Sequence, residues 1–304
     1  MTDFNVTILG AGSATPTIGR YPTAQLLTYQ NDCYLIDCGE GTQFRLLELK
    51  FRPSKLKGIF ISHLHGDHYH GLAPLISSLN MGGRTDSLKL FGPSGLDKIL
   101  ELLLGFAEVP LNFKLEFIET KTTERYLLFE NKYFTVHTIP LNHRVLCAGF
   151  LFKEKPQQRN FIKDALPENI DFEAIKILKS GENVLDEKGE ILYDFEKLTT
   201  PPLPPRSYAY CSDTKYEPSI IAIVKNVDLL YHETTFADDN AHQAADRYHS
   251  TAREAGKIAS QAQVKKLLIG HFSSRYKSFE VFLEQAKSEF QNTEIAEQAT
   301  VFEV

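Results

Sequence analysis

The segment ISHLHGDHYHG, residues 61–71, gathers four of the chain's ten histidines around one aspartate. It follows GIFIS, an apolar run with the length of a buried strand. Because alternate residues of an extended chain point to one side, His63 and His65 share a side, while Asp67 and His68 fall where the chain turns. Four nitrogen or oxygen ligands within six residues rarely arise from packing needs. The spacing H-x-H-x-D-H therefore predicts a metal site.

A pair of metal ions needs more ligands than this segment supplies, and three further candidates each follow a predicted strand. They are His143 in IPLNHR, Asp213 in AYCSDT and His271 in LIGHFSSRY. We expect the first ion to bind His63, His65 and His143, and the second to bind Asp67, His68 and His271, with the carboxylate of Asp213 as a bridge. Four other histidines receive no ligand role, and we expect them to be structural: His70, His137, His232 and His242.

Length and composition set the broad class. The chain has 304 residues, a net charge of −6 and 42% hydrophobic residues, which is typical of a globular protein. No run of about 18 apolar residues predicts a membrane span. MTDFNVTILG does not resemble a signal peptide, and the four cysteines lack paired spacing, so we expect reduced thiols and a cytoplasmic protein. The mild acidity argues against a broad nucleic-acid surface.

Strand-like and helix-like segments alternate in both halves, which predicts an α/β fold with a mixed sheet. QLLTY and CYLIDC flank QND, a hairpin signal. SIIAIVKN and TAREAGKIASQAQV show helical patterns, and Thr251 with Glu254 fits a capping box in the second. GLDKILELLLGF predicts a helix, FEVFLEQAKSEF a final helix and ATVFEV a final strand.

The composition of the sequence changes after AGFLFKEK. Residues 156–200 are polar, lack a coherent apolar period and end in TTPPLPPR, where proline favours a stiff extended exit. We therefore expect one domain over residues 1–304 that carries an insertion at residues 153–205. Six basic and five acidic residues lie between Lys153 and Lys179, so their charges nearly cancel.

The motifs carry a family resemblance. HLHGDH resembles the signature of the metallo-β-lactamase superfamily, whose fold is a four-layer αββα sandwich. The wider set resembles the ribonuclease Z family of tRNA 3′ endonucleases, in the same order along almost the whole chain. The stretches concerned are GSATPT, DCGEGTQFRL, SHLHGDHYHGL, LNHR, YCSDT, HETTF, HSTAREA and IGHFSSRY.

The resemblance implies a site and an activity. It implies two Zn²⁺ ions per subunit, bound by His63, His65, Asp67, His68, His143, Asp213 and His271. It also implies that Asp67 handles a proton of the attacking water, and that His249, oriented by Glu233, assists the leaving oxygen. The substrate would be precursor tRNA, cut by hydrolysis to leave a 3′-OH on the tRNA and a 5′-phosphate on the trailer. The insertion would be an arm that grips tRNA, and family members commonly form homodimers.

His249 precedes Thr251, the expected cap of a helix, where free backbone N–H groups would favour an anion. Two alternatives to the tRNA endonuclease stay open. The first is a dinuclear phosphodiesterase that acts on small esters or cyclic nucleotides, because IDFEAIKILKSGENV lacks the glycine–proline-rich arm tip usual in bacterial family members. A catalytically silent RNA-binding or metal-storage protein is the second, and the full ligand set with His249 argues against it.

Overall fold

The computed structural model describes residues 3–105, 110–167 and 169–304. The chain divides into two compact units. Unit 1 comprises Met1–Glu130, Thr135–Phe152 and Ser207–Val304, and unit 2 comprises Asn131–Phe134 and Lys153–Arg206. The insertion predicted over residues 153–205 falls within unit 2.

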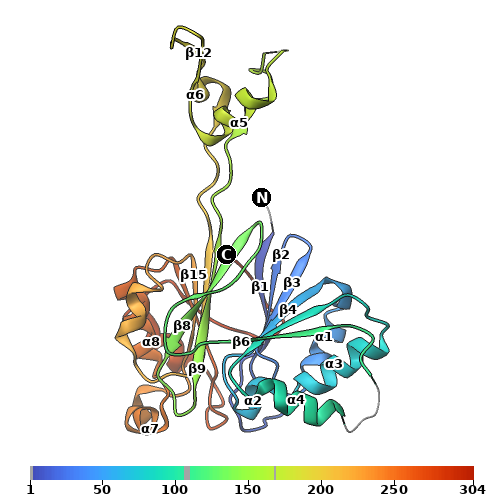
Figure 1. Ribbon diagram of the computed structural model, residues 1–304. Coiled ribbons are helices and arrows are strands. Elements are labelled where there is room, and N and C mark those ends of the chain that lie inside the picture. The colour runs from blue at the N-terminus through green and yellow to red at the C-terminus, as the bar shows by residue number, and fades with distance from the viewer. Residues whose placement is uncertain (1–2, 106–109, 168) are drawn as a thin grey trace. The chain divides into compact units, whose positions relative to one another are not determined.

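Two seven-stranded sheets form the centre of unit 1 in the described part of the chain (Figure 1). The first has the order β18 (Val301–Glu303), β1 (Phe4–Gly10), β2 (Ala24–Tyr29), β3 (Asp32–Ile36), β4 (Leu56–Phe60), β5 (Leu88–Gly92) and β6 (Leu115–Glu119). The second has the order β17 (Thr293–Ile295), β16 (Lys266–Gly270), β15 (Leu229–Glu233), β14 (Ser207–Cys211), β9 (Cys147–Glu154), β8 (Phe134–Leu141) and β7 (Leu127–Glu130). Both sheets mix parallel and antiparallel pairs, as predicted.

Aromatic side chains fill the space between the sheets. The ring of Phe60 on β4 lies 4.4 Å from that of Phe91, 5.3 Å from that of Phe150 and 5.3 Å from that of Phe152, between ring centroids. Successive residues of a strand point to opposite faces, so Ile59, the neighbour of Phe60, packs into the helix layer instead. Offset and edge-on aromatic pairs add to the stability that burial provides.

Helices cover the outer face of each sheet (Figure 1). α1 (Thr42–Glu48), α3 (Leu72–Met81) and α4 (Leu96–Gly105) pack on the first sheet, and α8 (Ala252–Ala262) and α9 (Glu280–Lys287) on the second. The capping box predicted for α8 is confirmed: Thr251 Oγ1 accepts from Glu254 N at 3.2 Å, and a Glu254 oxygen accepts from Thr251 N at 2.9 Å. Unit 1 is thus the predicted αββα sandwich.

One predicted helix is wrong. SIIAIVKN forms only the 3-10 helix η2 (Pro218–Ala222), and Asn226 then adopts a left-handed conformation with φ of 58°. The segment is too short for its apolar residues to complete an amphipathic face. The helix predicted over GLDKILELLLGF is confirmed up to Gly105, and its Phe106 lies outside the described residues.

Unit 2 contains a helix that was not predicted, because the polar sequence of the insertion shows no clear apolar period. α5 (Phe172–Ser180) begins where Asp171 accepts from Ala174 N at 2.7 Å, and it ends at Gly181 with φ of 88°. Only Ala174 and Leu178, four residues apart, are buried on it. The other elements are α6 (Phe195–Leu198) and the strand pairs β10 (Asn160–Phe161) with β13 (Thr199–Thr200), and β11 (Val184–Leu185) with β12 (Ile191–Tyr193).

All four cysteines are buried and free, as expected. In the parts of the chain that the structure describes, no helix has the length and hydrophobicity needed to cross a bilayer.

Candidate active site

The seven predicted ligands come together at the ends of strands in unit 1. His63 and His65 follow β4, and Asp67 and His68 lie on the short helix α2 (Gly66–Tyr69) that comes next. The remaining three follow strands of the second sheet: His143 follows β8, Asp213 follows β14 and His271 follows β16. Because β14, β15 and β16 are parallel, their carboxyl ends meet at one edge of the sheet.

Four of these side chains form a first group of donor atoms, which we call group A: His63, His65, His143 and Asp213. Nδ1 of His65 lies 3.0 Å from Nε2 of His63 and 3.1 Å from Nε2 of His143. Oδ2 of Asp213 lies 3.7 Å from Nε2 of His63 and 3.8 Å from Nε2 of His143. Burial lowers the pKa of all three histidines, which keeps them in the neutral form that a metal requires.

A second group, which we call group B, comprises Asp67, His68 and His271. Nε2 of His271 lies 3.3 Å from Nε2 of His68 and 3.3 Å from Oδ2 of Asp67, and the last two atoms are 3.4 Å apart. Oδ1 of Asp213 joins this group at 3.2 Å from His271 Nε2 and 3.4 Å from His68 Nε2. Asp213 therefore presents one carboxylate oxygen to each group.

The spacing of these atoms fits metal binding. Ligands at about 2.0–2.1 Å from a tetrahedral zinc ion stand about 3.3 to 3.4 Å from one another. The five distances measured in group B with Asp213 lie between 3.2 and 3.4 Å. Oδ1 of Asp213 is also buried without a hydrogen bond, which is costly unless a cation satisfies it. The residues present therefore fit two metal ions.

Buried negative charge points the same way. Asp37, Asp213 and Glu233 are at most 2% exposed, and Asp67 lies beside them. Among the described residues, no lysine or arginine pairs with any of the four; their partners are histidines, hydroxyl groups and backbone N–H groups. Burial raises the pKa of Asp213, but His271 and His68 outweigh it and hold that pKa well below its usual range. Bound cations would offset this concentration of carboxylates.

Four of the candidate ligand histidines make a contact through the second ring nitrogen. Nδ1 of His68 lies 2.8 Å from Asp37, that of His143 2.8 Å from the Tyr248 carbonyl, and that of His271 2.8 Å from Thr235 Oγ1. Nδ1 of His63 lies 3.0 Å from Ser62 Oγ. Such contacts fix the tautomer and the ring direction of a metal ligand.

Asp37, to which the sequence gave no role, lies directly behind the candidate ligand His68. Its carboxylate accepts from Ser62 N at 2.8 Å, Ser62 Oγ at 2.9 Å and the Tyr210 hydroxyl at 2.6 Å, besides its contact with His68. Its φ is 56°, and His271 and Tyr248 also have positive φ, at 62° and 60°. Residues other than glycine rarely adopt this backbone conformation, and such backbone strain concentrates at functional sites.

His249 lies beside the two groups. Its Nδ1 lies 2.9 Å from Glu233 Oε1 and 3.9 Å from Asp213 Oδ2. Burial lowers the pKa of His249, but the charge and hydrogen bond of Glu233 outweigh that effect and raise the pKa to about 9. The ring is thus held next to the carboxylate cluster in a form that can donate a proton.

Several N–H groups at the start of α8 already have acceptors within the protein. The N–H groups of residues 249–252 donate in turn to Ala244 O, Glu233 Oε1, Glu254 Oε2 and Phe236 O. Carboxylates and carbonyls thus occupy these four N–H groups, which leaves fewer donors for an anion than the sequence predicts.

A cavity of about 450 Å³ opens over both groups. His65, Asp67, Asp213, His249 and His271 line it, so the candidate ligands and His249 face one space. Three exposed side chains also line this cavity: His70, Arg144 and Arg247. The sequence predicts a structural role for His70 and gives no role to the two arginines. Arg144 stands directly after a ligand in LNHR, and that position is the one signal that could have found it.

Solved structures show the fold. The crystal structure of human tRNase Z, short form (ELAC1), has a TM-score of 0.71 and 24% identity, and covers 99% of each chain. The metallo-beta-lactamase fold protein YhfI from Bacillus subtilis has a TM-score of 0.71 and 19% identity, with 99% of this chain and 100% of that one covered. The predicted metallo-β-lactamase-like fold is confirmed.

Sequence relatives show the family. Residues 4–161 match the family model described as Anti-Pycsar protein Apyc1. Ribonuclease Z of Cytophaga hutchinsonii is 45% identical over 302 residues, which cover 99% of this chain and 96% of the relative. Ribonuclease Z of Bacteroides fragilis is 41% identical over 303 residues, 98% of each chain. The chain therefore belongs to the ribonuclease Z family and shares the Anti-Pycsar protein Apyc1 family pattern over residues 4–161.

Proposed function

We propose that this protein is an endoribonuclease that removes the 3′ trailer from precursor tRNA. It hydrolyses one phosphodiester, and the products are a tRNA that ends in 3′-OH and a trailer with a 5′-phosphate. The observation that carries the proposal is the sharing of Asp213 between groups A and B, with His249 in the same cavity. Two ligand groups that share a carboxylate could hold a pair of cations, and such a pair would suit an in-line attack on a phosphodiester.

Two zinc ions are the metals we propose, one in group A and one in group B. Imidazole and carboxylate ligands with these spacings suit zinc. When bound, the two ions would lower the pKa of water towards about 7 and offset the charge of the phosphate.

The protein's own groups then orient and move protons. Burial raises the pKa of Asp67, but His68 and His271 hold it well below its usual range, so Asp67 stays ionised. An ionised carboxylate at this position accepts a hydrogen bond from the attacking water and aims it, although it is a weak base. His249, fixed by Glu233, donates a proton to the departing ribose 3′ oxygen.

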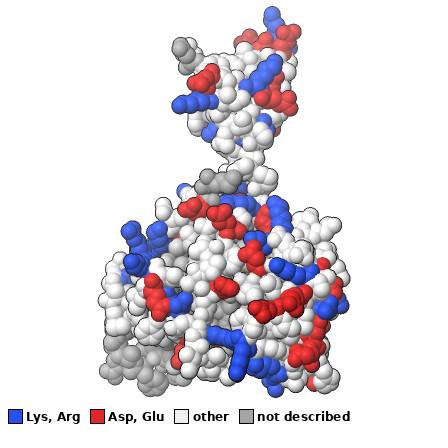
Figure 2. Space-filling model, turned by 180° about the vertical axis from the view of Figure 1, so that it is seen from behind, with Lys and Arg blue, Asp and Glu red and all other residues white. Residues whose placement is uncertain are grey.

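Unit 2 is the candidate tRNA arm, and its charge is unusual for that role. Residues 153–206 hold nine basic and eleven acidic side chains. On the face that Figure 2 shows, both signs are interspersed on this unit. Phosphate contacts make nucleic-acid binding strong and salt-dependent. We therefore expect unit 2 to orient the tRNA more than to bind it through electrostatic attraction. A homodimer, in which one subunit's arm serves the other's site, and a cytoplasmic location are parts of the same proposal.

Cleavage of a 3′-extended precursor tRNA by purified protein with zinc tests the proposal. We expect one cut next to the discriminator base and a trailer that a 5′-phosphate-dependent exonuclease degrades. No cut with metal bound would reject the proposal.

The near-neutral charge of unit 2 favours one second candidate, a phosphodiesterase for small or cyclic nucleotide esters. Turnover of a chromogenic phosphodiester is compared with that of precursor tRNA, before and after replacing residues 156–200 with a short linker. Unchanged turnover of the small ester together with no tRNA cleavage by the intact protein would favour this second candidate.

A further inference from the structure

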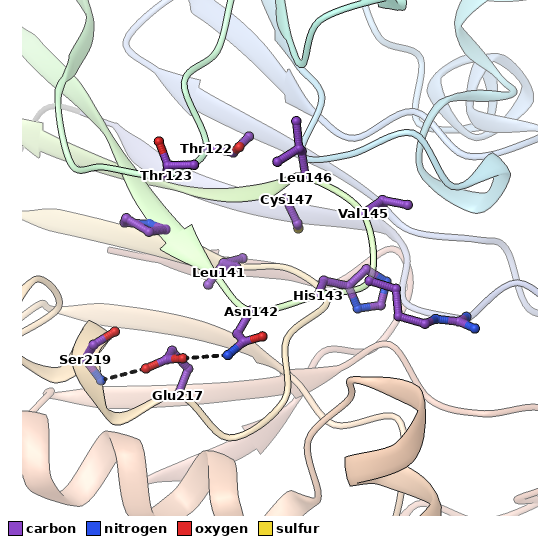
Figure 3. A pocket seen from close by; sticks show the side chains of 12 residues that line it. Thr122, Thr123, Leu141, Asn142, His143, Val145, Leu146, Cys147, Glu217 and Ser219 are labelled. Carbon is purple, nitrogen blue, oxygen red and sulfur yellow. Dashed lines mark hydrogen bonds between the residues drawn. The ribbon is translucent and has the colours of Figure 1, made fainter.

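A second cavity, of about 680 Å³, lies in unit 1 next to the candidate active site (Figure 3). We call it the side pocket. His143, a member of group A, lines it, and Arg144 lines both this pocket and the cavity over the ligands. A substrate that reaches from one cavity into the other therefore passes Arg144.

One wall of the side pocket carries a fixed carboxylate. Oε2 of Glu217 accepts from Nδ2 of Asn142 at 3.0 Å, and Oε1 accepts from the N–H of Ser219 at 3.2 Å. Figure 3 shows both contacts as dashed lines. The Asn142 hydrogen bond lowers the pKa of Glu217 despite partial burial, so the group is ionised and only accepts hydrogen bonds. Each oxygen keeps a lone pair for a ligand.

Three apolar side chains lie in the other walls of the side pocket. Leu141, Val145 and Leu146 line them, and Leu146 is 61% exposed at the surface. A large exposed apolar side chain beside a cavity favours a ligand with an apolar face. A nucleobase has such a face, and its edge carries the hydrogen-bond donors that a carboxylate can recognise.

Arg144 supplies the second element of such a site. Its side chain is exposed, and it makes no hydrogen bond or ion pair with any residue that the structure describes. An arginine between two cavities can bind the phosphate that links two nucleotides.

We propose that the side pocket binds the base of a nucleotide next to the scissile phosphate, and that Glu217 selects bases with an amino group. Adenine, cytosine and guanine offer an amino group to the carboxylate. Uracil offers only a ring N–H between two carbonyl oxygens, which the carboxylate repels. Arg144 binds the linking phosphate. The proposal rests on the proposed function, because it takes a nucleotide chain as the substrate.

Binding of nucleoside monophosphates to the zinc-loaded protein tests the pocket without any cleavage. AMP, CMP and UMP are titrated by calorimetry against the wild type. We expect AMP and CMP to bind about tenfold more tightly than UMP, the effect of one charge-assisted hydrogen bond worth about 1.4 kcal/mol. Equal affinities for the three nucleotides would overturn the proposal.

Two variants locate the effect. Glu217→Gln should reduce the tenfold preference to within about twofold. Leu146→Trp, at an exposed position that tolerates a larger side chain, should narrow the pocket and weaken AMP and CMP to the level of UMP. Glu284→Gln, an exposed carboxylate on α9, is the matched control and should leave all affinities unchanged. A preference that survives both pocket variants would show that another site selects the base.

Cleavage of precursor tRNAs then shows on which side of the cut the nucleotide bound in the side pocket lies. Two sets of substrates vary the base on the tRNA side or on the trailer side of the cut, and kcat/KM is measured for each. We expect uracil to be disfavoured on one side only, and Glu217→Gln to remove that difference. If nucleotides bind with the expected preference but no precursor is cut, the proposed function fails while the base site stands. Cleavage that ignores the base on both sides would refute the base site alone.

Discussion

The carboxylate of Glu233 lies 2.9 Å from Nδ1 of His249 and is completely buried. Its oxygens also accept from the N–H groups of Thr214, Ser250 and Thr235. This carboxylate is thus held by the backbone on several sides, and it fixes the imidazole in turn. Nδ1 is used in that contact, which leaves Nε2 of His249 as the nitrogen available to a substrate.

His249→Ala should lower kcat by about 10²- to 10⁴-fold, the usual contribution of a general acid, with both metal ions retained. Turnover of precursor tRNA and metal content by mass spectrometry check this outcome. His242→Ala on α7 (Ala241–Arg247), an exposed histidine paired with Asp246, is the control and should behave as wild type. Metal loss as large as in His63→Ala would mean that His249 is a ligand.

Asp67→Ala should abolish turnover while the fold survives. Its Oδ2 lies within 3.4 Å of both His68 and His271, so its removal takes one donor from group B and leaves group A complete. We expect metal content to fall from two equivalents towards one, with an unchanged circular dichroism spectrum. Asp97→Ala, an exposed carboxylate at the start of α4, controls for the loss of charge. Activity equal to wild type would remove Asp67 from the mechanism.

The side chains that meet in the candidate site could be predicted from the sequence, because their residue types and their positions after strands are visible in local order. Three histidines and an aspartate within six residues follow an apolar strand, and each remote ligand also follows a strand. Asp37 could not be assigned in this way, since its partners Ser62 and Tyr210 are 25 and 173 residues away and meet it only in the folded state. Its role depends on burial, which a short motif does not express.

The errors in secondary structure have a related cause. SIIAIVKN has helical spacing, but it spans two turns and ends at a left-handed Asn226, so a 3-10 helix replaces the expected α-helix. α5 is the reverse case, a helix that forms although the sequence did not predict it. Only two of its residues are buried, and its start and end are set by Asp171 and Gly181. Caps decide short helices in which the apolar period is weak.

Asp37→Asn should weaken metal binding about 10- to 100-fold and destabilise the fold. The amide keeps the size of the side chain but removes the charge that holds His68 and the Tyr210 hydroxyl. Hydrogen bonds to a charged group contribute about 1.5–3 kcal/mol, so we expect a loss of that order in the free energy of unfolding.

Competition with a zinc chelator and urea unfolding of metal-free protein measure the two effects of Asp37→Asn separately. Asp32→Asn, at the start of the same strand β3 and partly exposed, is the matched control. Unchanged metal affinity in the Asp37 variant would show that His68 keeps its orientation without this carboxylate.

His232→Gln should make folding stability less sensitive to mild acid. His232 is fully buried on β15, its Nδ1 donates to the Glu233 carbonyl at 2.8 Å, and its Nε2 has no hydrogen-bond partner among the described residues. Burial lowers the pKa of His232 below its ordinary value of 6.5. Below about pH 6.5 the unfolded chain therefore binds a proton that the folded chain refuses, and the free energy of unfolding falls by up to about 1.4 kcal/mol per pH unit. Above that pH both states are neutral and this contribution is constant.

Urea unfolding of the zinc-loaded protein between pH 5 and pH 8 gives the free energy of unfolding as a function of pH. The slope of that curve should be shallower for the variant on the acid side only, with His242→Gln as the exposed control. Parallel slopes for wild type and variant would show that His232 takes up its proton equally well in both states, which a fully buried imidazole with an unpaired nitrogen is not expected to do.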